Sequence, residues 1–248
     1  MSAIAAITQM IISQNIRCRR GTEISIMNDA SGNAARAVWP ALLKKSQTCL
    51  GRGRLPRNPN SGMEKKTHAI CVFCGSSFGR DPRFREAART VGAGIAKAGW
   101  SLVFGGGGNG LMGDVAKAAQ GGGAQVQGII PAFLQALEPP ISEEEKLIVT
   151  PHIQERKALM LKMADAFLVL PGGLGTLDEF FEVATEAQLG VHQKPIVVVN
   201  VDGYFDPLDT MLRAIVERGF ARDTIFKLYH LAEGPDAALK ILKDCLDK

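Results

Sequence analysis

Residues 165–182 read DAFLVLPGGLGTLDEFFE and contain three kinds of local signal in succession. The apolar run 166–170 predicts a short buried strand, and Pro171, Gly172 and Gly173 then end it. A helical pattern follows, with apolar residues three and four positions apart. A strand, a glycine turn and a helix in this order present backbone N–H groups to an anion, because the helix N-terminus has unpaired donors and glycine lets a phosphate come close.

The expected start of this helix at Thr176 has two interpretations. Thr176 and Glu179 fit a capping box, with the threonine as N-cap and the glutamate at N3, which would be a purely structural role. The same two side chains could instead belong to a site that holds a phosphate and a sugar. The local pattern leaves both interpretations open.

The length and the charge distribution limit the classes of protein to consider. The 248 residues suffice for one α/β domain and an appendage, and 46% hydrophobic and 22% charged residues are ordinary values for a globular protein. Of the 29 basic and 25 acidic residues, nine and two lie in 1–62, which leaves twenty and twenty-three for the remainder. That remainder is slightly acidic, so we expect no nucleic-acid partner.

Residues 1–62 differ in composition from the rest of the chain. They are rich in serine, asparagine, arginine and glycine and end in GRGRLPRNPNSG, which predicts disorder. Their arginines and few acids also resemble a transit peptide. Met63 begins MEKKTHAICVFCGSS, which looks like a natural start, so an upstream extension is a further interpretation. We expect a disordered or non-native extension over 1–62 and one folded domain over 63–248.

The five cysteines are odd in number and scattered, which does not indicate a disulfide framework. Cys71 and Cys74 form a C-x-x-C pattern within an apolar strand. No second ligand pair at zinc spacing accompanies them, so we interpret them as core residues and predict no metal. No apolar run approaches the roughly 20 residues that span a membrane. We expect a cytoplasmic protein with no membrane partner.

Strands and helices alternate along the folded part of the chain. This alternation predicts an α/β fold, a Rossmann-like doubly wound parallel sheet with helices on both faces. The expected strands cover residues 68–74, 100–104, 124–130, 146–150, 166–170, 194–200 and 228–231. The expected helices cover residues 82–98, 111–120, 153–163, 176–190, 207–218 and 234–247, and 131–142 reads as a loop.

Glycine and serine follow two further strands. Residues 105–113 read GGGGNGLMG, and four consecutive glycines are costly in chain entropy, so we expect a ligand or a neighbouring backbone to approach there. Ser76 and Ser77 follow the first strand, where simple turn chemistry is the alternative. Because loops after the carboxyl ends of parallel strands line the ligand crevice of a doubly wound sheet, we expect these turns and 171–175 to meet.

Several sequence blocks occur in the order and spacing of a known family. They are CGSS at 74–77, GGGGNGLMG at 105–113, ERKALM at 155–160, PGGLGTLDE at 171–179 and QLGVHQKPIVVVNVDGYF at 188–205. Over about residues 68–233 the chain resembles the Lonely guy family of cytokinin-activating phosphoribohydrolases. The resemblance implies a Rossmann-like fold, at least a homodimer, and a nucleoside 5′-monophosphate as substrate, with no metal or other cofactor.

The resemblance also implies site residues. Cleavage of an N-glycosidic bond creates an oxocarbenium-like ribose, which a carboxylate near the sugar stabilises while donors hold the phosphate. The catalytic roles would fall on Arg156 and Glu179. Substrate binding would fall on Ser76, Glu138, Lys157, Gly172, Gly173, Gly175, Thr176 and Thr185.

Two positions depart from the family pattern. Many members read T-W-x-Q-L-G after the motif helix, whereas this chain has Glu186 in place of the aromatic residue. That change could alter the base pocket or the subunit contact. Asp178 replaces a common glutamate, a milder change. The preferred base, adenine or an N6-prenylated adenine, therefore stays open.

Two rival functions share this sequence pattern. A nucleotide carrier or sensor would use the same crevice without cleaving its ligand, and the fold alone does not distinguish it from an enzyme. A pyridoxal-phosphate amino-acid decarboxylase would need a Schiff-base lysine in a cofactor site. Lys157 and Lys162 lie on a charged helix without such a setting, so we rank this function below the others.

Overall fold

The computed structural model describes residues 67–139, 141 and 146–247. The predictions made for residues 1–62, and with them the proposed domain boundary, lie outside these residues and stay predictions. Within the described part of the chain, every helix is too short or too polar to cross a lipid bilayer.

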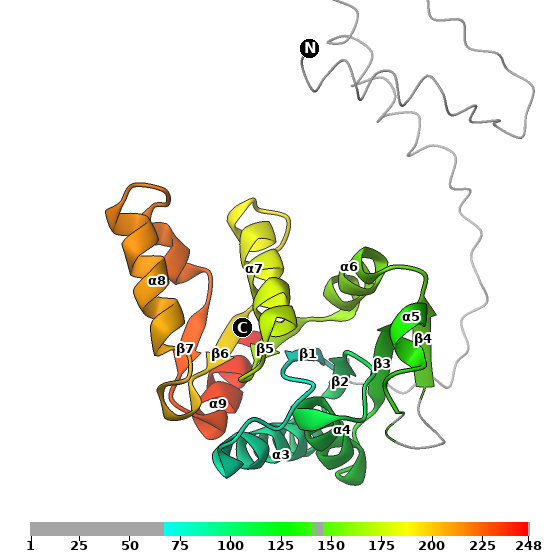
Figure 1. Ribbon diagram of the computed structural model, residues 1–248. Helices are drawn as coiled ribbons and strands as arrows, with labels where there is room; N and C mark the ends of the chain where they lie inside the picture. Colours follow the sequence, from blue (N-terminus) through cyan, green and yellow to red (C-terminus); the bar gives the residue numbers. More distant parts are fainter. Residues whose placement is uncertain (1–66, 140, 142–145, 248) are drawn as a thin grey trace, which may run out of the picture. The chain divides into compact units, whose positions relative to one another are not determined.

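Seven strands form one parallel sheet, with the order β4-β3-β2-β1-β5-β6-β7 (Figure 1). Every neighbouring pair in this sheet is parallel. The strands are β1 (Ala69–Phe73), β2 (Ser101–Phe104), β3 (Val126–Pro131), β4 (Lys146–Thr150), β5 (Ala166–Val169), β6 (Ile196–Val199) and β7 (His230–Ala232).

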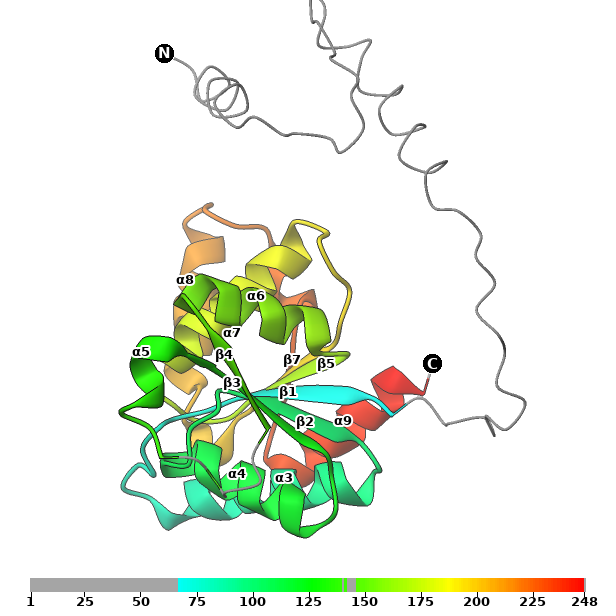
Figure 2. The ribbon, with the colours of Figure 1, turned by 90° about the vertical axis from the view of Figure 1, so that its right-hand side faces the viewer.

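Helices cover both faces of the sheet, as Figures 1 and 2 show. Side chains that alternate along a strand point to opposite faces, and in β1 Ile70 and Val72 join one buried core while Cys71 and Phe73 join the other. One face carries α3 (Pro82–Lys97), α4 (Gly110–Gly121) and α9 (Pro235–Leu246). The other carries α6 (Ile153–Met163), α7 (Leu174–Gln188) and α8 (Asp206–Glu217). The predicted Rossmann-like α/β fold class is confirmed.

The strand order reverses at β1, which pairs with β2 on one side and β5 on the other. At such a switch point the loops after the two strands separate in opposite directions and leave a crevice. Here the turns after β1 and β5 lie against each other, because the Gly75 N–H donates to the Pro171 carbonyl at 3.0 Å. The sheet therefore brings together the turns that the sequence predicted to meet.

Most element bounds match the sequence predictions within two residues, and β4 and α6 match fully. The predicted loop 131–142 also contains a short helix, α5 (Ala132–Gln135). A short 3₁₀ helix, η1 (Val201–Gly203), follows β6, and in it Asp202 has a left-handed φ of 54°. A second short 3₁₀ helix, η2 (Asp223–Lys227), precedes β7.

The capping box at Thr176 is wrong. Helix α7 begins at Leu174 with Gly173 as its N-cap, and no side chain hydrogen-bonds to this cap. Thr176 is 3% exposed, so its side chain packs inside the turn rather than capping the helix from outside. The helix thus starts two residues before the predicted start, because it includes Leu174 and Gly175. The pattern of apolar residues does not show this.

The prediction that Cys71 and Cys74 are core residues is confirmed. Both are buried free thiols, one in β1 and one directly after it. Burial raises the pKa of each thiol, so neither is activated as a thiolate.

Candidate active site

A buried ion pair joins the two residues that were assigned catalytic roles. Arg156 on α6 and Glu179 on α7 are 9% and 8% exposed, and Nη1 lies 3.0 Å from Oε1. The Arg156 Nε also donates to the Ile129 carbonyl near the end of β3, at 3.0 Å. The two residues are 23 positions apart in sequence, and their helices cover the same face of the sheet. The fold therefore fixes the positions of both side chains.

Burial is the largest influence on the ionisation of Glu179. It raises the pKa of Glu179 to about 7, although the positive charge and hydrogen bond of Arg156 act in the opposite direction. A carboxyl group with a pKa near neutrality gains or loses its proton at ordinary working pH. This is the property of a group that takes part in acid–base or electrostatic catalysis.

The four-glycine loop after β2 makes room for two of these side chains. A Cβ on Gly105 would lie 2.3 Å from Arg156 Nη2, and a Cβ on Gly107 would lie 2.8 Å from Glu138 Oε2. Glu138 is held there by the Asn109 side-chain amide, which donates to the same oxygen at 3.1 Å. The sequence predicted that a ligand or a backbone approaches this glycine loop. At Gly105 and Gly107 the neighbours are the side chains of Arg156 and Glu138, which therefore lie at the same loop.

Three further predicted residues line one pocket at the carboxyl ends of β1 and β5. Ser76, Gly172 and Gly173 face a space of about 300 Å³, together with the rings of Phe84 and Tyr204. This pocket lies at the switch point of the sheet, where nucleotides bind in doubly wound folds.

The N-terminus of α7 presents an open backbone to solvent. A Cβ on Gly173 or Gly175 would meet no heavy atom of the described residues within 4 Å, so within this part of the chain the space beside both glycines is open. The first N–H groups of a helix have no intrahelical partner, and no side chain caps those of α7. These amides and the positive end of the helix dipole are suited to a phosphate.

The buried side chain of Thr176 packs against Gly172 in the turn after β5. A Cβ on Gly172 would lie 2.1 Å from Thr176 Oγ1 and 2.7 Å from the Gly75 nitrogen, so only glycine fits between them. The predicted contact between this hydroxyl and a phosphate stays a prediction.

Lys157 is held by two carboxylates. Its Nζ lies 2.9 Å from Asp178 Oδ2 and 3.1 Å from Glu182 Oε2. Partial burial opposes its charge, but these hydrogen bonds outweigh that effect and raise its pKa. A Schiff-base lysine needs a lowered pKa, so this residue does not fit a pyridoxal-phosphate site. Lys157 does line a small cavity beside Glu179, which Glu186 also lines.

The structure does not bring Thr185 to the Arg156–Glu179 pair. Thr185 is exposed and lies in a different pocket, an apolar groove of about 160 Å³ between α7 and α8. The groove is lined by Phe180, Phe181, Leu212, Ile215 and Tyr229 among others.

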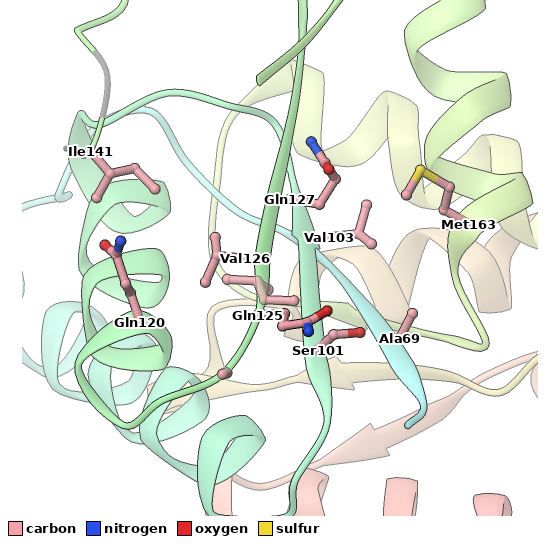
Figure 3. Close-up of a pocket in the computed structure, with 11 residues that line it drawn as sticks. Ala69, Ser101, Val103, Gln120, Gln125, Val126, Gln127, Ile141 and Met163 are labelled. Carbon is pink, nitrogen blue, oxygen red and sulfur yellow. The ribbon is translucent and has the colours of Figure 1, made fainter. Parts of the chain in front are cut away.

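A wider pocket of about 430 Å³ opens at the other edge of the sheet, by the first residues of β1 and β2 (Figure 3). Gln127, Val103 and Met163 lie on one side of the strands there, and Gln120 and Ile141 on the other. Among the described residues that line it, none has an ionisable side chain. Across the described residues, no group of three or more His, Cys, Asp or Glu is placed to hold a metal.

Sequence reasoning missed Tyr204, whose hydroxyl donates to the Gly172 carbonyl at 2.5 Å. The two residues are 32 positions apart, and no local pattern marks the tyrosine. Only the fold, which places η1 beside the turn after β5, reveals this contact.

An anion held at the N-terminus of α7 would lie at the same edge of the sheet as Glu179, whose pKa is raised to about 7. This arrangement defines the class of the protein: a Rossmann-like α/β protein with an open helix N-terminus suited to an anion and a buried arginine–glutamate pair. The model of a family described as "Possible lysine decarboxylase" matches residues 112–242.

Curated relatives give that family a second description. The chain is 46% identical over 151 residues to the cytokinin riboside 5′-monophosphate phosphoribohydrolase LOG7 of Arabidopsis thaliana, covering 61% of this chain and 70% of LOG7. It is 41% identical over 174 residues to the enzyme named LOG of Oryza sativa subsp. japonica, covering 70% and 71%. The chain belongs to this family, the LOG or Lonely guy family.

Solved structures agree with the fold. A molybdenum cofactor binding protein from Rippkaea orientalis has a TM-score of 0.56 at 23% identity, covering 73% of this chain and 99% of its own. The Moco carrier protein of Chlamydomonas reinhardtii has a TM-score of 0.55 at 23% identity over the same shares. At this level of identity the likeness shows the fold alone.

Proposed function

We propose that this protein is a phosphoribohydrolase that acts on a nucleoside 5′-monophosphate. It hydrolyses the N-glycosidic bond and releases a free base and ribose 5-phosphate. The substrate is a cytokinin riboside 5′-monophosphate, AMP or both. The observation that carries the proposal is the buried Arg156–Glu179 pair at the glycine-rich edge of the sheet, and the named activity of the LOG relatives supports it.

The 5′-phosphate binds at the start of α7 in this mechanism. The amides near Gly173 and Gly175 donate to its oxygens, and the positive end of the helix dipole adds to the attraction. Ser76 lies in the same pocket and offers a hydroxyl to the phosphate. The phosphate thus fixes the sugar at a set distance from the second turn of α7, which carries Glu179.

The chemistry then needs an ionised carboxylate. As the C1′–N bond breaks, positive charge develops on the ribose, and the Glu179 carboxylate stabilises it or orients the attacking water. Water oxygen bonds to C1′, and the departing base receives the electron pair of the broken bond. One proton of that water ends on the base, so the products are the neutral base and ribose 5-phosphate.

Arg156 keeps the carboxyl group reactive. Its positive charge counteracts the effect of burial on the pKa of Glu179 and so increases the ionised fraction at neutral pH. Its second anchor, the Ile129 carbonyl, fixes the planar guanidinium.

A direct assay distinguishes this function from its rival. The full chain is incubated with AMP and, separately, with N6-isopentenyladenosine monophosphate, and free base is measured by chromatography. The proposed enzyme releases base catalytically from at least one of them, and the ratio of the two kcat/KM values gives the base preference. A carrier or sensor would bind a nucleotide, which calorimetry would detect, but it would release no base.

We also propose that the protein is a homodimer. The apolar groove between α7 and α8 supports this proposal, together with an exposed apolar side chain on each of the two helices, Phe181 on α7 and Met211 on α8. Sedimentation at micromolar concentration tests it. A monomer at all concentrations would contradict it.

A cytoplasmic location is the remaining part of this proposal. Cys71, Cys74 and Cys245 are free thiols, which is ordinary for a protein of a reducing compartment. Cell fractionation tests the location, and recovery in an organelle would contradict it.

A further inference from the structure

The glycine turn after β5 is held by hydrogen bonds to two of its carbonyl groups. The Pro171 carbonyl accepts the Gly75 N–H at 3.0 Å, and the Gly172 carbonyl accepts the Tyr204 hydroxyl at 2.5 Å. The first bond links two turns of the sheet edge by their backbones. The second comes from a side chain, so it can be removed without changing the backbone.

The second bond controls the direction of an amide. The Gly172 carbonyl and the Gly173 N–H belong to one planar peptide unit, so fixing the oxygen fixes the N–H on the opposite side. A peptide between two glycines rotates easily, because neither residue has a Cβ to restrict it. The hydroxyl of Tyr204 therefore selects one orientation of the N–H that stands at the N-cap of α7.

Tyr204 is itself held firmly. Its ring packs edge-on against Phe84 and Phe205, with centroids 5.5 and 5.0 Å apart. The residue two positions before it, Asp202, receives two hydrogen bonds from Arg83, at 2.7 and 2.5 Å. The hydroxyl is thus placed by α3 and η1 together.

We propose that Tyr204 is a positioning residue for phosphate binding, which acts by orienting the Gly172–Gly173 peptide. The inference rests on the proposed function, because it assumes that this N–H meets the phosphate of the substrate. Tyr204 hydrogen-bonds to the turn through its hydroxyl, so we expect loss of that hydroxyl to affect the phosphate subsite alone. Recognition of the base and the chemical step should remain.

The test compares Tyr204→Phe with the wild-type full chain. Removal of the hydroxyl should raise KM for AMP, or for the better substrate, about fivefold to tenfold and leave kcat within about twofold. The inhibition constant of ribose 5-phosphate should weaken by the same factor, and that of adenine should not change. The chain has two tyrosines, and Tyr229→Phe, which removes a hydroxyl outside the turn pocket, is the matched control. Compared at equal oligomeric state, its KM and its inhibition by ribose 5-phosphate should match those of wild type.

Two results would overturn the inference. One is a Tyr204→Phe protein whose KM and ribose 5-phosphate inhibition both stay within about twofold of wild type. The other is equal weakening of adenine and ribose 5-phosphate together with a lower melting temperature, which would mean a merely structural role.

Calorimetry of ribose 5-phosphate separates this inference from the proposed function. If the wild-type protein binds ribose 5-phosphate and Tyr204→Phe binds it about fivefold to tenfold more weakly, the inference holds even if no nucleotide is cleaved. In that case only the hydrolase proposal fails. If wild type does not bind ribose 5-phosphate, the inference fails as well.

Discussion

Glu179 is an unusual residue for a protein interior. Burial of a carboxylate costs free energy, and an ion pair with a partner such as Arg156 recovers only part of that cost. A pair of apolar side chains would fill the same space at no such cost. The cost of burying this pair supports the catalytic role that we propose for it.

The raised pKa of Glu179 predicts a pH dependence of folding. The folded protein holds this proton more tightly than the unfolded chain, so the free energy of unfolding should fall as pH rises from about 4.5 to about 7. The contribution of this one group should be about 3 kcal/mol over that window, since each pKa unit is worth about 1.4 kcal/mol.

Chemical denaturation of wild type and Glu179→Gln at pH 4.5 and pH 8 checks this prediction. Other groups titrate equally in both proteins, so the difference between them isolates Glu179. Wild type should lose more stability than the variant between the two pH values. Parallel behaviour of the two proteins would contradict the raised pKa.

The same pKa predicts the pH range over which the activity of the enzyme rises, the ascending limb of its pH–rate profile. If the ionised carboxylate is the active form, kcat/KM should rise with pH with an apparent pKa near 7. The substrate phosphate also ionises, near pH 6, so a variant is needed to assign the limb to the enzyme. Arg156→Gln removes a charge that lowers the pKa of Glu179 and should move the limb to higher pH. A limb that stays in place would show that another group controls it.

At the scale of a single element, α7 combines two requirements at its N-terminus. Its first turn must be helical to aim its amides, and its surface must stay bare to admit a phosphate. Gly173 and Gly175 meet no protein atom that would forbid a side chain, and neither has a positive φ. The fold does not require glycine at these two positions, so we attribute them to the ligand.

Alanine substitution tests this explanation. Gly175→Ala should keep or slightly raise the melting temperature, because alanine favours a helix, whereas Gly173→Ala should lower it slightly, because glycine is preferred to alanine at an N-cap. Both variants should raise KM for the nucleotide about tenfold or more. Gly121→Ala, at the end of α4, also has open space around it and is the matched control. Unchanged KM in both turn variants would mean that these glycines have no role in binding.

The start of α7 also shows a limit of local sequence patterns. The threonine and glutamate of PGGLGTLDE have the spacing of a capping box, yet Gly173 is the cap and the two side chains point into the protein. Spacing along a helix does not tell which side faces solvent. The family resemblance pointed to Glu179, whereas the spacing of the motif alone did not.

At the scale of the whole molecule, the sheet was predictable because its signals are local. Each strand is a short apolar run and each helix has its own period, so the fold class and most element bounds follow from the sequence. The meeting of the turns after β1 and β5 also follows, since a parallel sheet collects all carboxyl ends at one edge.

Contacts between distant residues were not predictable in the same way. The bond from Tyr204 to Gly172, the approach of Glu138 to Gly107 and the position of Thr185 in another groove all depend on how loops fold across the sheet edge. No periodicity records such contacts. The resemblance brought Arg156 and Glu179 into one list of residues, and only the structure supplies the 3.0 Å contact and the burial that give the pair its chemistry.

Base release by Glu179→Gln is the decisive measurement, because it separates binding of the phosphate from action on the sugar. The amide keeps the shape of the side chain and removes its charge. We predict that kcat falls by about 10²-fold to 10⁴-fold while ribose 5-phosphate still binds within about threefold of wild type. Release of base at a rate within about threefold of wild type would contradict the account.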